Sequence, residues 1–334
     1  MSAVVCMAHK DSRSVISVNQ QASLIVEAMI AKAEQLGITV TYLPCGARIL
    51  DLGLKAPGSL LAGRYAAEAS LGGMGQVGFL PLDFGDYWLP GVSVTVDQPE
   101  VGCMASQYAG WGIRRGDFFA IGSGPARAQA AVEPLFKQHL IDYVDQAETA
   151  VIILEGPTLP NDDVGTFIAR KCRLSPDQVT MLMAPAASVA GSIQLCARVV
   201  ATGMHKMLKL GFDVRKVLHG YGVCPIAPVV PDEDLASAHL NDCVLYGGQV
   251  HYTMRAGDDE LQALIERIPS SASPDYGTPC HALFMRYGNF YNIDPLLFCP
   301  SEVTINNLSS GRTYHAGRPN PQVLKTSLLG DSIK

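Results

Sequence analysis

The sequence predicts a mixed α/β protein (α+β in the arrangement of its elements) that forms two lobes with a pocket between them. Its 334 residues are enough for a sizeable core and for two domains. Hydrophobic residues make up 48% and charged residues 17%, which is typical of a folded chain. Segments with strand-like and helix-like apolar periods alternate irregularly, without the regular order of a barrel or a repeat array.

The first half of the chain predicts five strands and four helices. Ser17 caps a helix with an apolar stripe, and Gly37 ends it. Residues 38–43 and 47–54 alternate as two strands around a Pro-Cys-Gly turn. The elements that follow are a helix at 59–71, strands at 76–82 and 92–97, a helix at 99–111, and a strand, tight loop and helix within 118–132.

The second half opens with an apolar strand at 150–156, a helix at Asp162–Cys172 and a strand at 179–185. Residues 184–206 then read as one long helix with almost no charge before its last turn. The remaining elements are a short helix at 213–222, a proline-rich connection at 225–234, a strand pair at 243–254 broken by two glycines, a helix at 258–268 and a hairpin at 301–317.

These elements predict an N-terminal extension at residues 1–14, a first lobe at 15–150 and a second lobe at 151–330. The alternative is that the C-terminal hairpin returns to the first lobe. The extension has neither the basic region nor the apolar run of a signal peptide.

Composition excludes several functional classes. The formal charge of −6, without any run of Lys and Arg, argues against a nucleic-acid partner. No uncharged apolar stretch is long enough to span a membrane. Nine cysteines are scattered singly, which predicts reduced thiols in a cytoplasmic protein. The histidines and cysteines lack metal-ligand spacing, so we expect no metal site.

Two glycine-rich motifs have different interpretations. Residues 73–78 match G-x-G-x-x-G, but a helix is expected before them and a strand after them, which favours a plain turn over a dinucleotide site. Gly122, Ser123 and Gly124 follow a strand and precede a helix, where backbone N–H groups and Arg127 suit an anion. The alternative is a tight turn with a surface arginine.

The long helix at 184–206 is mostly apolar, as expected of a buried helix, but one of its faces carries polar residues. Gln194, Arg198 and His205 share this face with the methyl group of Ala201. A solvated face normally carries several Lys, Glu or Asp residues, so this face is more typical of a cleft wall.

Several long segments in the right order resemble methenyltetrahydromethanopterin cyclohydrolases along nearly the whole chain. They are SQYAGW, FFAIGSGPARA, APAASVAGSIQLCARVV, PIAPV, NDCVLYGG and FYNIDPLLF. The resemblance implies the cyclohydrolase-specific fold, a homotrimer, and no metal or organic cofactor. It implies reversible hydrolysis of methenyl-tetrahydromethanopterin, a cyclic amidinium cation, to the formyl derivative. This one-carbon chemistry belongs to methanogenesis and methylotrophy, and Tyr108, where archaeal members tend to have Lys, favours a bacterial-type member.

The resemblance also implies a general base that this chain lacks. The family carries a glutamate one turn after the arginine that matches Arg198, and that position here is Ala201. Loss of a general base costs about 10²–10⁴-fold in rate. An unpaired arginine about 4 Å from a cationic ligand would repel it by roughly 4 kcal/mol at an effective dielectric near 20. We therefore expect poor binding unless another acid enters, with Asp242 as first choice before Asp294 and Glu302.

The other site residues follow from the resemblance and from the helix face. Arg198 is the expected electrostatic centre, with Ser188, Gln194 and His205 lining the pocket and Tyr108 contacting the pterin. The loop residues Gly122, Ser123, Gly124 and Arg127 are expected to hold polar or anionic parts of the substrate. The alternatives are a pterin-binding homologue without turnover, an inactivated variant, and an enzyme of another folate-like cofactor.

Overall fold

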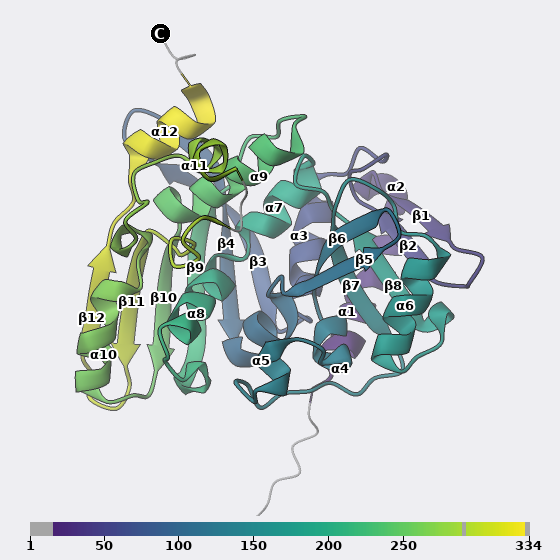
Figure 1. Cartoon of the computed structure of the whole chain (residues 1–334), viewed down its shortest axis with the longest axis horizontal. Helices are drawn as coiled ribbons and strands as arrows, with labels where there is room; N and C mark the ends of the chain where they lie inside the picture. Colours follow the sequence, from purple (N-terminus) through teal and green to yellow (C-terminus); the bar gives the residue numbers. More distant parts are fainter. Residues whose placement is uncertain (1–15, 289–291, 331–334) are drawn as a thin grey trace, which may run out of the picture.

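Two six-stranded sheets stand side by side, with helices around and between them (Figure 1). The computed structural model describes residues 16–288 and 292–330, so the predicted extension at 1–14 lies outside the described residues. Helix α3 (Leu60–Ser70) packs against strands of both sheets and fills the space where they meet. The predicted mixed α/β class is confirmed.

The first sheet has the strand order β1–β2–β8–β7–β6–β5. Its central strands β7 and β8 are parallel and almost wholly buried, which explains their uninterrupted apolar sequences. The strands are β1 (Thr39–Tyr42), β2 (Arg48–Asp51), β5 (Trp111–Arg115), β6 (Phe118–Ser123), β7 (Ala150–Glu155) and β8 (Val179–Met183).

The second sheet has the order β12–β11–β10–β9–β4–β3, and only β10 and β11 run parallel. Buried residues alternate with more exposed ones along β10, β11 and β12, as expected for strands covered on one face. The strands are β3 (Gly75–Asp83), β4 (Trp88–Asp97), β9 (Val217–Pro225), β10 (Gln249–Met254), β11 (Glu302–Asn307) and β12 (Thr313–Gly317).

The sheets do not follow the boundary predicted at residue 150. Strands β5 and β6 pair onward with β7, so one sheet continues across that boundary. Strand β4 pairs with β9, so the second sheet also contains residues from both sides. The predicted C-terminal hairpin is confirmed as β11–β12, and it joins the sheet that holds β3 and β4. Hydrogen bonds between distant strands decide this division, and local periodicity carries no information about them.

The helices begin at the caps that the sequence offers. The hydroxyls of Ser17 and Ser59 accept N–H bonds in the first turns of α1 and α3, and Asn161 caps α6 in the same way. The α-helices besides α3 are α1 (Val18–Ile30), α2 (Ala33–Leu36), α4 (Ala126–Ala130), α5 (Pro134–Lys137), α6 (Asp162–Cys172), α7 (Val189–Cys196), α8 (Val199–Lys209), α9 (Glu233–Asp242), α10 (Asp258–Leu264), α11 (Cys280–Tyr287) and α12 (Pro321–Leu329). The π-helical segments are η1 (Glu100–Gln107) and η4 (Cys243–Gly247). The 3-10 turns are η2 (Pro176–Gln178), η3 (Val214–Lys216), η5 (Ile265–Arg267) and η6 (Ser270–Ala272).

The single helix predicted at 184–206 is wrong, because the chain forms two helices, α7 and α8. The backbone N–H of Arg198 donates to Leu195 O, three residues back, at 3.0 Å, which interrupts the α-helical ladder. Arg198 itself occupies the N-cap position of α8, with φ −80° and ψ 4°. No glycine or proline marks this break, so the sequence gives no local signal for it.

Three other local predictions are also wrong. Residues 213–222 form the short turn η3 and then enter strand β9, because Val217 and its neighbours pair with β10 and β4. Residues 243–247 form a π-helical turn and not a strand. The supposed connection at 225–234 ends at Asp232, which caps the unpredicted helix α9.

The largest hydrophobic cluster lies between the second sheet and helices α7 and α8, and smaller clusters lie on the two faces of the first sheet. The eight cysteines of the described residues are free thiols, and all but Cys45 are buried. No helix of the described residues is long and apolar enough to cross a membrane.

Candidate functional site

Arg198 lies where the two halves of the molecule meet. Helix α7 packs on α3, and α8 packs on β9 and β10 of the second sheet, while the arginine side chain reaches strands of the first sheet. Its Nη2 donates to Ser123 Oγ at 2.9 Å and to Gln194 Oε1 at 3.0 Å. The same nitrogen forms an ion pair with Glu155 Oε1.

The acid beside Arg198 is therefore Glu155, and the expectation of an unpaired arginine is wrong. Glu155 is the last residue of β7, and its register partner Ile121 lies two residues before Ser123 on β6. The side chains of Arg198 and Glu155 are 12% and 17% exposed, so the pair is largely desolvated but still open to small molecules. A carboxylate directly after five buried apolar residues is the sequence signal that could have identified Glu155.

Ala201 lies in the first turn of α8 and is 2% exposed. It belongs to the same hydrophobic cluster as Val199 and Met204. No carboxylate occupies this position, so Glu155 alone neutralises Arg198 among the described residues.

The three acids proposed as replacements lie elsewhere. Asp242 is fully buried, and it accepts hydrogen bonds from Cys280 N at 2.9 Å and from Ser327 Oγ at 2.5 Å. Burial raises the pKa of Asp242 to about 6, against the lowering effect of these bonds. Asp294 accepts from Ser273 and from its own loop, and Glu302 pairs with neighbours on the second sheet. All three acids are structural, because their bonds are to neighbours within the protein. The type of side chain alone does not reveal which acid the fold brings to Arg198.

The glycine-rich segment contains one site residue, Ser123, and two structural glycines. Ser123 contacts Arg198, as described above. Gly122 is packed so closely that an added Cβ would lie 3.0 Å from the Ile152 side chain, and Gly124 has φ +97° and donates its N–H to Ser106 O at 2.9 Å. Gly122 belongs to strand β6, between Trp111 and Leu154, and Gly124 forms the turn after it. With Gly122 in the sheet and the Gly124 N–H bonded to Ser106, the loop does not form the expected anion cradle.

Arg127 was expected at the substrate, but its side chain is fully buried. Its Nε and Nη2 donate to the two carboxylate oxygens of Glu133 at 2.7 Å each. Its Nη1 donates to the carbonyl oxygens of Met104, Ala105 and Ser106. With these donors engaged inside the protein, Arg127 stabilises the end of η1 and does not face a ligand.

Tyr108 and His205 form a stacked pair beside this arginine. Their ring centroids are 4.7 Å apart, and Tyr108 Oη lies 3.2 Å from His205 Nε2. Burial raises the pKa of Tyr108, and the nearby Arg127 guanidinium opposes the shift. Burial, with a smaller contribution from Lys209, lowers the pKa of His205 to about 4, so the imidazole is neutral at pH 7.

Ser188 is placed differently from the expectation that it lines a pocket. Its hydroxyl accepts the N–H of Gly191 at 3.0 Å and donates to Pro185 O at 2.7 Å. Ser188 is therefore the N-cap of α7 and sets the direction in which Gln194 and Arg198 project.

Three buried polar atoms near Arg198 have no hydrogen-bond partner among the described residues. They are Arg198 Nε, Gln194 Nε2 and Gln107 Oε1. Gln107 ends η1, and its Nε2 donates to Ala197 O at 3.2 Å, directly beside the arginine. Gln107 is not among the site residues expected from the sequence, although it precedes Tyr108 in the segment SQYAGW.

Glu233, at the start of α9, is a second carboxylate in this neighbourhood. It lies close enough to Glu155 for the charge of Glu155 to raise the pKa of Glu233. Burial raises the pKa of Glu233, the N–H groups of Ala187 and Ala186 lower it, and the charges of Asp234 and Glu155 raise it. The neighbourhood of Arg198 therefore holds one cation and two carboxyl groups.

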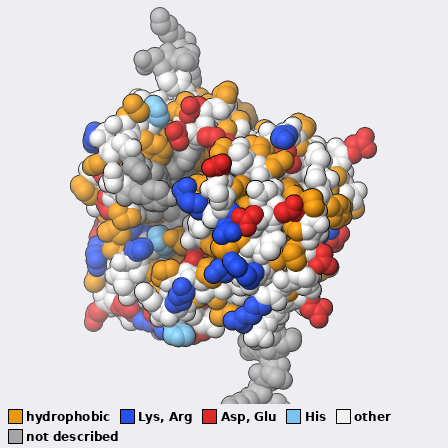
Figure 2. Space-filling model, turned by 45° about the vertical axis from the view of Figure 1, so that its right-hand side comes forward, with side chains coloured by type: hydrophobic (Ala, Val, Ile, Leu, Met, Phe, Trp, Pro, Cys, Tyr) orange, Lys and Arg blue, Asp and Glu red, His pale blue; other side chains and the backbone are white. Residues whose placement is uncertain are grey.

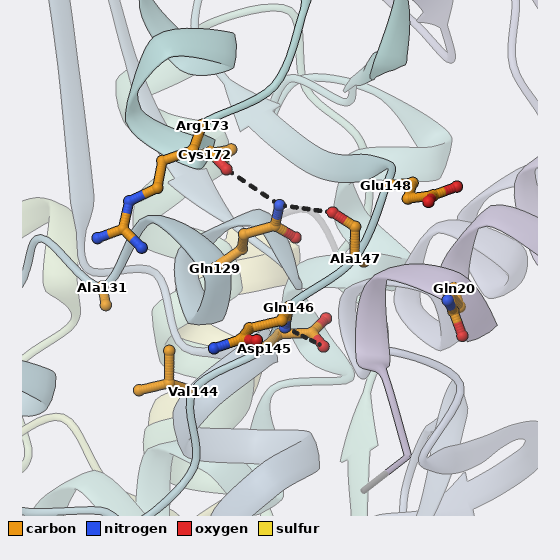
Figure 3. A pocket seen from close by; sticks show the side chains of 10 residues that line it. All are labelled: Gln20, Gln129, Ala131, Val144, Asp145, Gln146, Ala147, Glu148, Cys172 and Arg173. Carbon is orange, nitrogen blue, oxygen red and sulfur yellow. Dashed lines mark hydrogen bonds between the residues drawn. The ribbon is translucent and has the colours of Figure 1, made fainter. Parts of the chain in front are cut away.

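Two surface cavities lie away from this cluster. One, of about 490 Å³, is lined by Gln129, Arg173 and other mostly polar residues, with the Gln129 amide bonded to backbone carbonyls (Figure 3). The other, of about 1000 Å³, lies at the beginning of α12. None of the site residues expected from the sequence lines either cavity.

The described residues hold no group of three or more His, Cys, Asp or Glu side chains suited to a metal ion. On the face shown in Figure 2, Lys and Arg side chains gather near the middle, with Asp and Glu among them.

A protein-family model described as Cyclohydrolase (MCH) matches residues 17–328. Curated relatives named methenyltetrahydromethanopterin cyclohydrolase cover nearly the whole chain. The relative from Methanothermobacter marburgensis is 42% identical over 93% of this chain and 99% of its own length. The relative from Methanococcoides burtonii is 38% identical over 93% and 98%, and that from Xanthobacter autotrophicus is 39% identical over 96% and 95%.

Proposed function

We propose that this chain, which belongs to the methenyltetrahydromethanopterin cyclohydrolase family, catalyses the reversible hydrolysis of methenyl-tetrahydromethanopterin to the formyl derivative. The observation that supports turnover most directly is the ion pair between Arg198 and Glu155 where the two sheets meet. This pair supplies the anion that the sequence alone did not assign.

The charge balance of the pair favours a cationic substrate. A lone arginine about 4 Å from an amidinium would oppose binding by roughly 4 kcal/mol at an effective dielectric near 20. Glu155 cancels that repulsion, because its carboxylate lies on the same guanidinium nitrogen. The additional carboxyl group of Glu233 makes the surroundings net negative when it is ionised.

The chemistry asks little of the protein beyond positioning and proton transfer. The amidinium carbon is already electrophilic, so water must be held beside it and must lose a proton as the C–O bond forms. Ser123, Gln194 and Arg198 provide polar contacts there, and the flat Tyr108–His205 pair offers a surface on which the pterin can stack. In this proposal the reaction uses no metal or organic cofactor, and the chain works as a homotrimer.

A pterin-binding protein without turnover is the second candidate, and Ala201 is the observation that favours it. The family resemblance places a carboxylate at this position, and a methyl group cannot accept a proton. On this alternative, the Arg198–Glu155 pair would hold the substrate without activating water.

A spectroscopic hydrolysis assay on the purified protein separates the candidates. We expect the absorbance of the methenyl substrate to disappear faster with the protein than in buffer, and in proportion to protein concentration. Equilibrium binding of the substrate, measured by ultrafiltration, without acceleration of hydrolysis would instead support the pterin-binding alternative. Light scattering of the same sample measures whether the assembly is a trimer.

A further inference from the structure

We infer that Glu155 is the proton acceptor for hydrolysis in this chain, and that Gln107 and Gln194 position the attacking water beside it. This inference rests on the proposed function and assigns a group to the step that Ala201 cannot perform.

The position of Glu155 meets the requirements of a general base. One carboxylate oxygen is held by Arg198 Nη2, which fixes the side chain, while the other has no hydrogen bond to the described residues. The carboxylate is 17% exposed, so a water molecule can reach the free oxygen. The bond to Oε1 orients the carboxylate, while the lone pairs of Oε2 stay available to accept a proton.

The two glutamine side chains have fixed orientations. Gln194 Oε1 accepts from Arg198, so its Nε2 must point the other way. Gln107 Nε2 donates to a backbone carbonyl, so its Oε1 is likewise directed. Both side chains are fully buried, and leaving polar atoms unpaired in such a place is costly.

The unpaired atoms near Arg198 complement one water molecule. Gln194 Nε2 and Arg198 Nε are donors, and Gln107 Oε1 is an acceptor. A water oxygen accepts two hydrogen bonds and its hydrogens donate two more. One of the two donors and the Gln107 acceptor hold the water, its second hydrogen points to Glu155, and its remaining lone pair is free to attack the amidinium carbon.

The other candidate for proton acceptor is His205, and its environment argues against that role. A pKa of about 4 makes its imidazole a weak base at pH 7, and its Nε2 already contacts Tyr108. The guanidinium of Arg198 carries N–H donors and no acceptor, so it cannot take the proton. Glu233 has backbone N–H groups of Ala186 and Ala187 at its carboxyl group, so we assign it to local charge rather than to proton transfer.

The reaction balances through Glu155. As the water oxygen bonds to the amidinium carbon, a water proton passes to Glu155 and the C=N π electrons move to nitrogen. The neutral carbinolamine then loses its hydroxyl proton while the leaving nitrogen gains a proton and its C–N bond breaks, which gives the formyl group and an amine. Glu155 mediates this transfer and finally releases one proton to solvent.

The test exchanges the carboxylate between two positions. We expect Glu155→Gln to lower kcat by about 10²–10⁴-fold. Ala201→Glu alone should change kcat less than about tenfold, because a base is already present. The double variant Glu155→Gln/Ala201→Glu should recover at least about tenfold over Glu155→Gln, because a carboxylate one turn from Arg198 reaches the same guanidinium. Glu260→Gln, which removes a carboxylate paired with Lys216 at the surface, is the control.

Each outcome decides between specific statements. If Glu155→Gln keeps kcat within threefold of the wild-type value, the inference is overturned while the proposed function stands. If the wild-type chain is inactive and Ala201→Glu is active, the proton acceptor belongs at position 201 and the inference is overturned. If neither turns over, the proposed function itself fails. Should Glu155→Gln not fold by circular dichroism, Glu155→Asp replaces it, with lowered kcat and little change in KM as the supporting result and unchanged kcat as the contrary one.

The positioning role of Gln107 has a separate readout. We expect Gln107→Leu, which keeps the volume but removes both the Oε1 acceptor and the Nε2 bond to Ala197 O, to lower kcat about tenfold or more with little change in KM. A purely structural role would lower thermal stability without this division between kcat and KM. Unchanged kcat in a folded Gln107→Leu protein would overturn this part of the inference.

Discussion

Tyr108 lies stacked on His205, with its hydroxyl oxygen 3.2 Å from the imidazole Nε2, although the two residues are 97 positions apart in the chain. The contact connects the end of η1 to helix α8 and lies beside the buried Arg127. This contact joins the parts of the chain that carry Gln107 and Arg198. The protonation state of His205 therefore affects the packing around the whole site.

His205 should make the protein less stable in mild acid. The folded pKa of about 4 lies below the ordinary value of 6.5, so the unfolded chain binds the proton more readily. The contribution is therefore fully present above pH 6.5, and it is lost as the pH falls from 6.5 to 4. We expect a loss of up to about 3 kcal/mol from this group.

Urea unfolding at pH 7 and pH 4 measures this effect. The free energy of unfolding of His205→Phe should fall less across this range than that of the wild-type protein. His251→Gln changes an exposed imidazole and should behave like the wild type. Equal pH dependence in the wild type and His205→Phe would contradict the prediction.

Asp242 should show the opposite dependence on pH. Burial raises its folded pKa to about 6, above the ordinary value of 3.8, so the folded protein binds the proton more readily. The cost of its charge is therefore greatest above pH 6 and is relieved as the pH falls toward 4. Its size is about 3 kcal/mol.

Asp242→Asn removes this charge while keeping a similar shape. Relative to the wild type, its free energy of unfolding should be higher at pH 7 than at pH 4, whatever the constant cost of the altered bonds to Cys280 and Ser327. If the difference between the two proteins is independent of pH, Asp242 does not titrate as described. Turnover at pH 7 should change little, because Asp242 lies outside the Arg198 cluster.

The buried pair of Arg127 and Glu133 should control stability and not substrate affinity. Both side chains are at most 6% exposed, and both guanidinium–carboxylate bonds are 2.7 Å long. Removing one partner leaves an unpaired buried charge, so we expect Glu133→Gln to cost about 3–5 kcal/mol. Guanidinium chloride unfolding gives the value.

A double variant provides the control for that pair. Arg127→Leu/Glu133→Leu removes both charges, together with the Nη1 bonds to the carbonyl oxygens of Met104, Ala105 and Ser106. Because no unpaired charge remains, its loss of stability should be smaller than the sum of the losses of Arg127→Leu and Glu133→Leu. In each variant that still folds, KM should remain close to the wild-type value. A large rise in KM with unchanged stability would return Arg127 to the substrate site.

Gly203 should tolerate no side chain, because α8 packs directly on β10 there. An added Cβ would lie 2.2 Å from Tyr252 Oη, which donates to Val200 O at 2.7 Å. We expect Gly203→Ala to lower the free energy of unfolding by about 1–3 kcal/mol through overpacking. Thermal unfolding measures the change.

Two further variants define the cause of this effect. Tyr252→Phe should recover part of the loss when combined with Gly203→Ala, because the clashing oxygen is gone. Gly112→Ala is the matched control, since nothing lies within 4 Å of an added Cβ there, and its stability should be almost unchanged. Equal effects of the two alanine substitutions would disprove the packing explanation.

The sequence predicted most elements whose formation depends on local signals. Ser17 and Ser59 cap the helices expected after them, and the apolar run before Glu155 forms the buried strand β7. Polar caps satisfy free N–H groups within a few residues, and apolar periodicity records which side of an element is buried. The family resemblance read from the segments between SVNQQ and SLLG is also confirmed by the matching family model and relatives. Such a resemblance can be recognised from the sequence alone, because it depends only on the order of the residues.

The tertiary structure decided what the site contains. The partner of Arg198 is 43 residues away on a different strand, and Asp242, which carries the same kind of charge, is held by Cys280 and Ser327. The division of strands between the two sheets was equally beyond the sequence. Both depend on hydrogen bonds and packing between distant segments, whose free energy leaves no periodic mark on the local sequence. Local sequence thus determines most helices and strands and identifies the family. Only the folded arrangement determines which acid neutralises which cation.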